Sequence, residues 1–204
     1  MLTSCVYLYE VKIFPLNIAI LPGERVPLHI FEPRYKAMIE DNINNGENFG
    51  ICLSFGGKVS QFGTEVKVHK IQKTFFDGSS DIIVKGVRSF KILEYRRDPS
   101  KKVCDEAETI PIDLQGEKAS RRDLLELYNE YSDKFVQLED FDVSLLDLSL
   151  VELARGMGLS YQQKDRYIGE KSSEARENIL FAQVKYLLFI KQQEENREFN
   201  ILLN

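Results

Sequence analysis

FPLNIAILPGERVPLHIFEPRY, residues 14–35, predicts a strand, a tight turn, a second strand and the start of a helix, in that order. Pro22-Gly23 forms the turn, because proline presets φ at the first corner and glycine accepts a positive φ at the next. Residues 26–31 alternate loosely between apolar and polar side chains and predict the second strand. Pro33 lies where the first helical residue is expected, since its missing N–H is not needed there.

The pattern outside this stretch is one short helix and then strands as far as residue 114. The helix is amphipathic and is expected to end at Asn45-Gly46, where glycine favours a left-handed cap. Asp77-Gly78 is a strong hairpin signal, and Gly86 indicates a bulge or a close backbone approach. We expect six to eight short strands, which predict a small, partly closed barrel with few free edges. Their expected positions are 11–14, 26–31, 49–55, 59–62, 63–73, 82–84, 90–93 and 109–114, with a polar loop at 95–108.

The rest of the chain is predicted to be a C-terminal helical bundle, so the expected fold class is α+β. Gln115-Gly116-Glu117 marks the boundary, which divides the chain into a barrel domain, 1–116, and a helical subdomain, 117–204. Ser120 and Asp123 have the spacing of a capping box. Further helices are expected at 145–157 before Gly158, from Ser160 to Ile168, and in a long final segment capped by Ser172.

Charge and hydropathy argue against a nucleic-acid or membrane protein. Residues 1–113 carry 15 basic and 15 acidic side chains, whereas residues 114–204 carry 12 and 17, so neither half is basic. The N-terminus lacks the basic and apolar regions of a signal peptide, and no apolar run approaches the length of a membrane span. We expect a soluble, cytoplasmic protein.

The cysteines and histidines predict no metal site. Cys52 lies in an apolar run and is expected in the core, whereas Cys5 and Cys104 are expected to be free surface thiols. His29 and His69 lie in separate strand patterns, and a satisfied or half-exposed imidazole is the simpler interpretation of each. No metal and no cofactor are expected.

Several blocks of the sequence together resemble the N-terminal domain of Lon proteases. The blocks are FPL, LPG and PLHIFEPRY, followed in the same order by Phe49-Gly50, Gly63-Thr64, Asp77-Gly78 and GVRSF at 86–90. The resemblance covers residues 10–113 most specifically and the helical part more loosely. It implies a barrel related to the PUA fold, and a module that recognises polypeptide substrates.

The sequence lacks the motifs that would accompany catalysis by a Lon protease. It contains neither the G-x-x-x-x-G-K-[ST] motif of a phosphate-binding loop nor a G-x-S-x-G nucleophile motif. We therefore expect a stand-alone, ATP-independent N-domain without enzymatic activity. Glu32 and Arg34 are spaced as a catalytic pair could be, but a carboxylate at the helix start and an arginine bracing the turn explain them more simply. Asp77 is interpreted as a turn residue.

The predicted function is binding of protein or peptide segments, and the role that the resemblance implies is that of an adaptor in proteolysis or protein quality control. A concave junction between barrel and helices is the default position for such a segment. Exposed apolar side chains are expected at the Pro22-Gly23 turn and before Asp77. Arg88 is interpreted either as an ion-pair partner of Glu32 or as a ligand contact. The candidate protein-binding residues are Pro22, Gly23, Phe31, Glu32, Arg34, Tyr35, Phe75, Phe76 and Arg88.

Two alternatives to polypeptide binding follow from the barrel. The PUA relationship implies RNA binding, for which a face of lysines is available, although the neutral barrel and the acidic helical half argue against it. Those lysines are Lys67, Lys70, Lys73, Lys85 and Lys91. A small-molecule pocket in the barrel is the least favoured alternative. Related domains with such a pocket have paired zinc-binding cysteines, which this sequence lacks. Partner, ligand and oligomeric state are left open.

Overall fold

The computed structural model describes residues 7–100, 102–135 and 148–202, with side chains for all of these except 133–135 and 198–202. The chain forms two compact units. The first contains the described residues up to Leu114 together with Ser160–Gly169, and the second contains the remainder. The predicted boundary between residues 116 and 117, as a division into separately folding domains, stays a prediction. Cys5, which was expected to be a surface thiol, lies outside the described residues.

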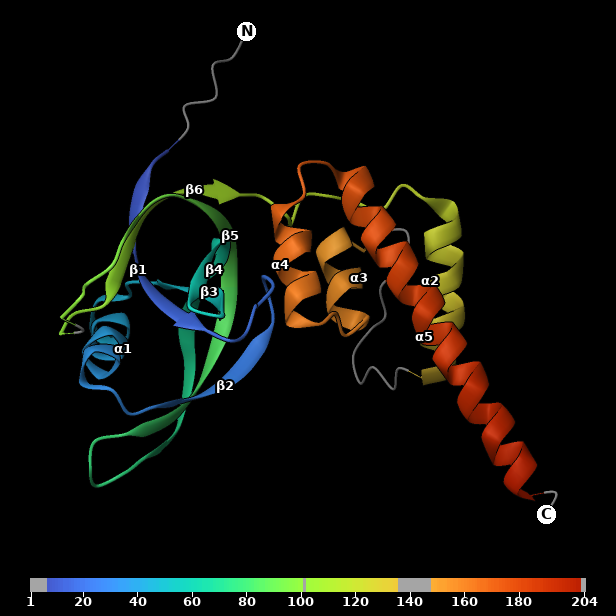
Figure 1. Cartoon of the computed structure of the whole chain (residues 1–204), viewed down its shortest axis with the longest axis horizontal. Helices are drawn as coiled ribbons and strands as arrows, with labels where there is room; N and C mark the ends of the chain where they lie inside the picture. Colours follow the sequence, from blue (N-terminus) through green and yellow to red (C-terminus); the bar gives the residue numbers. More distant parts are fainter. Residues whose placement is uncertain (1–6, 101, 136–147, 203–204) are drawn as a thin grey trace, which may run out of the picture. The chain divides into compact units, whose positions relative to one another are not determined.

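The first unit is built on a six-stranded sheet in the order β2-β5-β4-β3-β1-β6, with a further pairing between β6 and β5 (Figure 1). Strand β6 therefore pairs with both β1 and β5, so the hydrogen-bonded pairing runs from β5 through β4, β3, β1 and β6 back to β5. Strands β1 and β3 are parallel, and the other pairs are antiparallel. The elements of this unit are β1 (Tyr9–Leu16), β2 (Arg25–Ile30), α1 (Pro33–Asn45), β3 (Phe49–Phe55), β4 (Lys58–Thr74), β5 (Ser80–Arg96), β6 (Asp105–Ile112) and α4 (Tyr161–Gly169).

The stretch at residues 14–35 folds as the sequence predicts, with a strand, a turn, a strand and a helix. Gly23 has a φ of 87°, and α1 begins at Pro33 and ends before Gly46, whose φ is 72°. Both glycines occupy the left-handed region, which an L-residue with a Cβ enters at a cost of roughly 1–2 kcal/mol.

The strands after α1 are longer and fewer than predicted. Residues expected to form two strands at 59–62 and 63–73 form the single 17-residue strand β4, and the expected strands at 82–84 and 90–93 are joined in β5. Gly63 lies within β4 and does not end the strand. It faces Cys52 and Phe90 at close range, where a Cβ would lie 2.5 Å from the Cys52 sulfur. The two ends of the expected polar loop at 95–108 also belong to β5 and β6, which leaves 97–104 between the strands.

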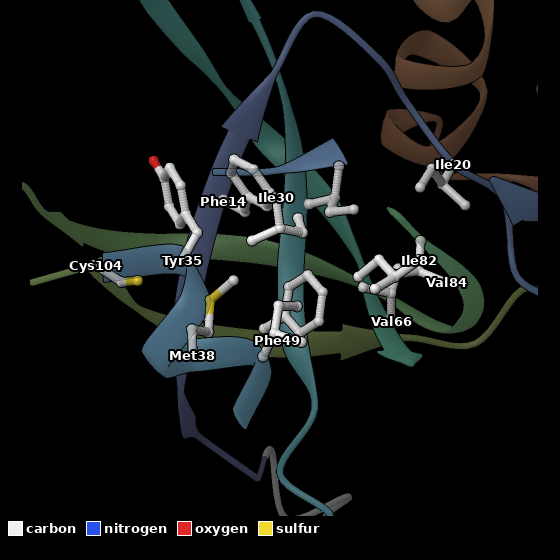
Figure 2. Close-up of a cluster of buried hydrophobic side chains, with 12 residues drawn as sticks. Phe14, Ile20, Ile30, Tyr35, Met38, Phe49, Val66, Ile82, Val84 and Cys104 are labelled. Carbon is white, nitrogen blue, oxygen red and sulfur yellow. The ribbon is translucent and has the colours of Figure 1, made fainter. Parts of the chain in front are cut away.

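A cluster of buried apolar side chains holds α1 against the sheet (Figure 2). The Phe14 and Tyr35 rings stack with centroids 3.8 Å apart, and Met38 packs beside them. Cys104 belongs to this cluster, with 9% of its surface exposed, and its thiol donates to the Arg34 carbonyl at 3.3 Å. The prediction that Cys104 is a surface thiol is wrong, because the residue that precedes β6 lies against α1. Cys52 is fully buried, as predicted.

The Pro22-Gly23 turn packs against Gly86 of β5. The Gly23 amide donates to the Gly86 carbonyl, and the Gly86 amide donates to the Glu24 carbonyl, both at 2.9 Å. A Cβ on Gly86 would lie 2.4 Å from the Leu21 carbonyl oxygen, so the predicted close backbone approach at this glycine is confirmed. The Glu24 carboxylate binds Lys164 of α4 at 2.7 Å, which ties the turn to the helix that the chain contributes from its far end.

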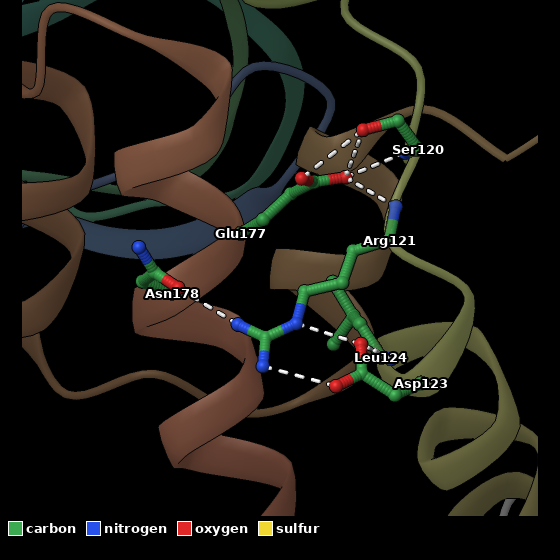
Figure 3. Close-up of polar contacts among 6 residues, drawn as sticks. All are labelled: Ser120, Arg121, Asp123, Leu124, Glu177 and Asn178. Carbon is green, nitrogen blue, oxygen red and sulfur yellow. Dashed lines mark hydrogen bonds and ion pairs between the residues drawn. The ribbon is translucent and has the colours of Figure 1, made fainter.

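The described residues of the second unit form α2 (Arg122–Phe135), α3 (Leu150–Gly156) and α5 (Ser173–Leu202). The predicted Ser120–Asp123 capping box does not form. Glu177 of α5 instead accepts hydrogen bonds from the Ser120 and Arg121 amides and from the Ser120 hydroxyl, while Asp123 binds Arg121 (Figure 3). A carboxylate is favourable there because the first amides of a helix lack partners and carry partial positive charge.

The other predicted helix starts and ends are partly confirmed. Reciprocal hydrogen bonds between Ser160 and Gln163 open α4, and the Ser172 hydroxyl caps α5. The helix predicted at 145–157 begins only at Leu150, where Ser149 and Glu152 form a capping box that the sequence reading missed. Residues 145–147 lie outside the described residues. Within the described parts of the chain, no helix combines the length and apolarity needed to cross a bilayer.

Candidate protein-binding site

Three phenylalanines form an exposed surface, here called the aromatic patch, where β2 ends and the β4–β5 hairpin turns. Phe31 is 61% exposed, Phe76 is fully exposed and Phe75 is half-buried. All three are sequence-predicted site residues, and Phe31 is separated from Phe75 by more than forty residues of chain. Its exposure rules out a core position for Phe31.

His29 connects the two sides of the patch. Its ring stacks on Phe31 with centroids 5.9 Å apart and meets Phe75 edge-on at 5.8 Å. The Nδ1 atom of His29 lies 2.7 Å from an Asp81 carboxylate oxygen, which fixes the ring. Lys73 places its ammonium 4.5 Å from the centre of the Phe75 ring, within the range of a cation–π contact.

The hairpin that carries Phe75 and Phe76 is fixed by its own turn. The Phe75 amide donates to the Ser79 carbonyl, and the Asp77 carboxylate accepts from the Ser79 amide at 2.9 Å and from its hydroxyl at 2.6 Å. These hydrogen bonds lower the pKa of Asp77 below its usual value. Lys36 of α1 donates to the Asp77 carbonyl at 2.9 Å, so the tip is also held to the helix. Asp77 is a turn residue, as predicted.

Two of the predicted site residues are part of the framework. Pro22 is buried, so the prediction that its turn exposes an apolar side chain is wrong: the packing of the turn against Gly86 covers it. Tyr35 is 3% exposed and stacks on Phe14. Gly23 is half-buried and its amide is bonded to β5. Contact with a partner through any of them stays a prediction.

Glu32 and Arg34 support the start of α1. The Arg34 Nε donates to a Glu32 carboxylate oxygen at 3.1 Å, and its guanidinium lies 4.4 Å from the centre of the Tyr35 ring. The Arg34 side chain is 12% exposed, so it is a packed residue rather than a surface arginine. The Glu32 side chain makes no capping hydrogen bond to the helix. The pair braces the start of α1, as the simpler interpretation predicts.

Arg88 belongs to a second polar cluster on another part of the sheet. It donates from Nε and Nη2 to the Glu65 carboxylate at 3.1 and 2.7 Å and covers the Tyr9 ring, so the predicted alternative of a pair with Glu32 is wrong. Register explains this outcome, because Glu65 and Arg88 face each other across β4 and β5. Tyr9 and Glu65 line a pocket of about 430 Å³, together with Glu10, Val11, Lys12, Glu47, Asn48 and Glu106.

We expect this cluster to make the free energy of unfolding depend on pH in the alkaline range. Burial, together with the hydrogen bond to Glu65, raises the pKa of Tyr9 to about 12. Because the folded value lies above the unfolded one of about 10, the folded state holds the proton more tightly. The stabilisation is fully present below pH 10 and is lost as pH rises towards 12. Tyr9→Phe should therefore show a shallower loss of unfolding free energy over this interval in urea titrations. An identical slope would contradict this role of Tyr9.

The sequence reading missed the polar residues that organise the aromatic patch. His29, Asp81 and Lys73 lie opposite one another on β2, β5 and β4, so their side chains share a face. Alternation along β2 does place His29 and Phe31 on one side, which is a usable signal. Asp81 and Lys73 could not be predicted as neighbours of His29, because the sequence of a single strand does not reveal its register with the other two strands.

Comparison with known proteins agrees with this architecture. The family model described as "ATP-dependent protease La (LON) substrate-binding domain" matches residues 10–196. A Lon N-terminal domain protein from Xanthomonas campestris superposes with a TM-score of 0.69 at 25% identity, covering 85% of this chain and 98% of that one. The N-terminal domain of the Mycobacterium avium complex Lon protease shares the fold, with a TM-score of 0.63 at 17% identity over 87% of this chain and 98% of that one. The chain belongs to the family of Lon substrate-binding domains.

Proposed function

We propose that this chain binds exposed hydrophobic segments of other polypeptides, without cleaving them, through the aromatic patch. The observation that carries the proposal is the grouping of Phe31, Phe75 and Phe76 where β2 ends and the β4–β5 hairpin turns, with His29 in contact with Phe31 and Phe75. Family membership supports a substrate-recognition role in general. The return of β6 to β5 supports a partly closed, PUA-like barrel as that framework.

The physical basis is burial of aromatic surface by the incoming segment. Each aromatic side chain buries roughly 150–250 Å² when covered, and removal of apolar surface from water contributes about 25 cal/mol per Å². Association and ordering of the segment oppose this gain by several kcal/mol. The patch is held by the His29 contacts and the Asp77 turn before a partner arrives, so little further ordering of this chain is needed. We expect micromolar affinity, which suits transient engagement of many sequences.

We further propose that binding without turnover makes the chain an adaptor in proteolysis or protein quality control. Such a module delivers or retains a polypeptide, and the chemistry is performed by another protein. Capture of the chain by a purified Lon protease on a sensor surface, with and without an unfolded polypeptide, tests this step separately from binding itself.

Truncation of the patch should weaken binding. For the triple variant F31A/F75A/F76A we expect the dissociation constant for a reduced, alkylated and fluorescently labelled unfolded protein to rise by about tenfold or more. Fluorescence anisotropy measures it. The stability of the variant should be close to that of the wild type, because Phe31 and Phe76 are solvent-exposed.

The matched control is F55A/L93A/V103A. These three apolar residues are 68%, 50% and 63% exposed but lie away from the β2 end and the hairpin tip. Their removal should leave the affinity unchanged. Equal losses in the two triple variants, or no loss in the first, would show that the aromatic patch is not the binding surface.

A further inference from the structure

We propose that the polypeptide segments bound at the aromatic patch carry carboxylates next to their apolar residues, and that these carboxylates dock on a row of cations across β2, β5 and β4. This inference rests on the proposed function and adds the class of segment recognised. The row, here called the cationic row, consists of Arg25, Lys85 and Lys67.

The register places the three cations side by side on the outer face of the sheet. Arg25 lies opposite Lys85, and Lys85 lies opposite Lys67. Directly opposed residues of antiparallel strands project to the same face. The next residues along each strand, Val26, Val84 and Val68, pack against the buried cluster of Figure 2. The cationic row therefore points away from the core, because successive side chains alternate between faces.

No carboxylate within the described structure neutralises this row. The side chains of Arg25, Lys67 and Lys85 form no ion pair with any described residue, and Arg25 and Lys67 are exposed. Like charges directly opposite one another destabilise a sheet. Lys70, exposed on β4 opposite Ile83, extends the same positive surface towards the hairpin tip. An incoming carboxylate would relieve the repulsion among all of these cations.

The cationic row and the aromatic patch lie on one continuous face. Along β2, Arg25 and His29 are four residues apart and both are exposed. At about 3.3 Å per strand residue, the two features are separated by roughly 13 Å. The His29–Asp81–Lys73 row forms the near edge of the patch. An extended segment of four or five residues can therefore reach from one to the other, which predicts aromatic and acidic residues a few positions apart.

The charge distribution favours an acidic polypeptide over RNA as the occupant. The first 113 residues are neutral and the remainder carries an excess of five acidic side chains, whereas a nucleic-acid binder is generally basic over a whole domain. A short segment with two or three carboxylates needs only the local row. A polyphosphate would extend beyond it. Lys91, which the RNA hypothesis includes, lies opposite Phe62 and Ile110 and outside the row.

The test compares two labelled peptides and one RNA by fluorescence anisotropy. The first peptide carries two phenylalanines followed after three residues by three glutamates, the second has glutamine in place of each glutamate, and the RNA is a short oligouridylate. We expect the glutamate peptide to bind wild-type protein about tenfold more tightly than the glutamine peptide, a difference typical of a few exposed charge pairs. Raising the ionic strength from about 0.05 M to about 0.3 M should remove most of that difference.

The informative variant is K67E/K85E, with K58E/K102E as a control of equal charge change at exposed lysines elsewhere in the first unit. K67E/K85E should abolish the preference for glutamate and leave glutamine-peptide binding unchanged, whereas K58E/K102E should behave as wild type. Misfolding is not expected to obscure the result, because K67E/K85E replaces one pair of like charges across β4 and β5 by another and also places a carboxylate beside Arg25. Single-variant K85E should melt at or above the wild-type temperature by circular dichroism.

The outcomes separate this inference from the proposed function. Loss of all peptide binding in F31A/F75A/F76A, with an unchanged glutamate preference in K67E/K85E, would leave the proposed function intact and overturn the cationic row. Peptide binding that is unchanged in F31A/F75A/F76A would overturn the proposed function. If oligouridylate binds the wild type more tightly than either peptide, and K67E/K85E abolishes that binding, the ligand of the cationic row is RNA rather than an acidic segment.

Discussion

Replacing Gly86 with alanine should lower the free energy of unfolding by about 3 kcal/mol, within the range for strain imposed on a packed backbone. A Cβ at this position would lie 2.4 Å from the Leu21 carbonyl oxygen and 3.1 Å from its carbon. The neighbour is backbone rather than the end of a flexible side chain, so β5 and the LPG turn must separate. Their separation would weaken the two hydrogen bonds that join Gly86 to Gly23 and Glu24. Urea unfolding followed by circular dichroism measures the loss.

Gly57→Ala is the matched control for this prediction. Gly57 has a φ of 78° with open space around the missing Cβ, so alanine there meets only the left-handed conformational cost of roughly 1–2 kcal/mol. The contrast between the two glycines isolates the backbone contact. Equal destabilisation of the two variants would mean that the LPG turn and β5 can move apart freely.

Replacing Arg176 with methionine should cost about 3–5 kcal/mol of unfolding free energy, the usual result of leaving a buried charge without its partner. The Arg176 side chain is 4% exposed, and its Nη1 binds the Glu117 carboxylate at 2.5 Å while Nη2 donates to the Glu170 carbonyl. Glu117 is 24% exposed at its side chain, and its Oε2 is a buried atom without a hydrogen-bond partner. The Glu117 carboxylate would then be left without a compensating positive charge.

Two further variants test this explanation. Arg155→Met removes a partly exposed and longer i,i+3 pair with Glu152, at 3.8 Å, and should cost less than about 1 kcal/mol. Adding Glu117→Gln to Arg176→Met should recover stability, because the stranded charge is removed along with its partner. If the double variant is no more stable than Arg176→Met alone, lost packing rather than an uncompensated charge explains the effect.

The features that the sequence predicted are those set by neighbouring residues. The strand, turn, strand and helix of residues 14–35 follow from proline and glycine conformations. The Asp77 turn and the Ser160 and Ser172 caps follow from hydrogen bonds between residues two or three positions apart. The family could also be read from short blocks in order. Local rules fail at Ser120, where Glu177, 57 residues away, replaces the expected partner.

Other predictions failed because they depended on how distant segments and strands pair. The burial of Cys104 requires β6 to meet α1, and the pairing of Arg88 with Glu65 rather than Glu32 is decided by the alignment of β4 and β5. Gly63 and Gly86 look like strand ends or interruptions in sequence, but β4 and β5 continue through them and contain bulges where they bend. A shift of one residue would reverse every inward and outward assignment.

The sequence by itself determined the order of the elements, the family and the three phenylalanines with the best prospects for binding. Only the tertiary structure decided that Phe31 and Phe75 meet through His29, that Pro22 and Tyr35 are framework, and that cations from three strands form one row. The reason is physical: turns and caps are fixed by interactions within a few residues, whereas a surface assembled from β2, β4 and β5 exists only once long-range pairing has selected a single register.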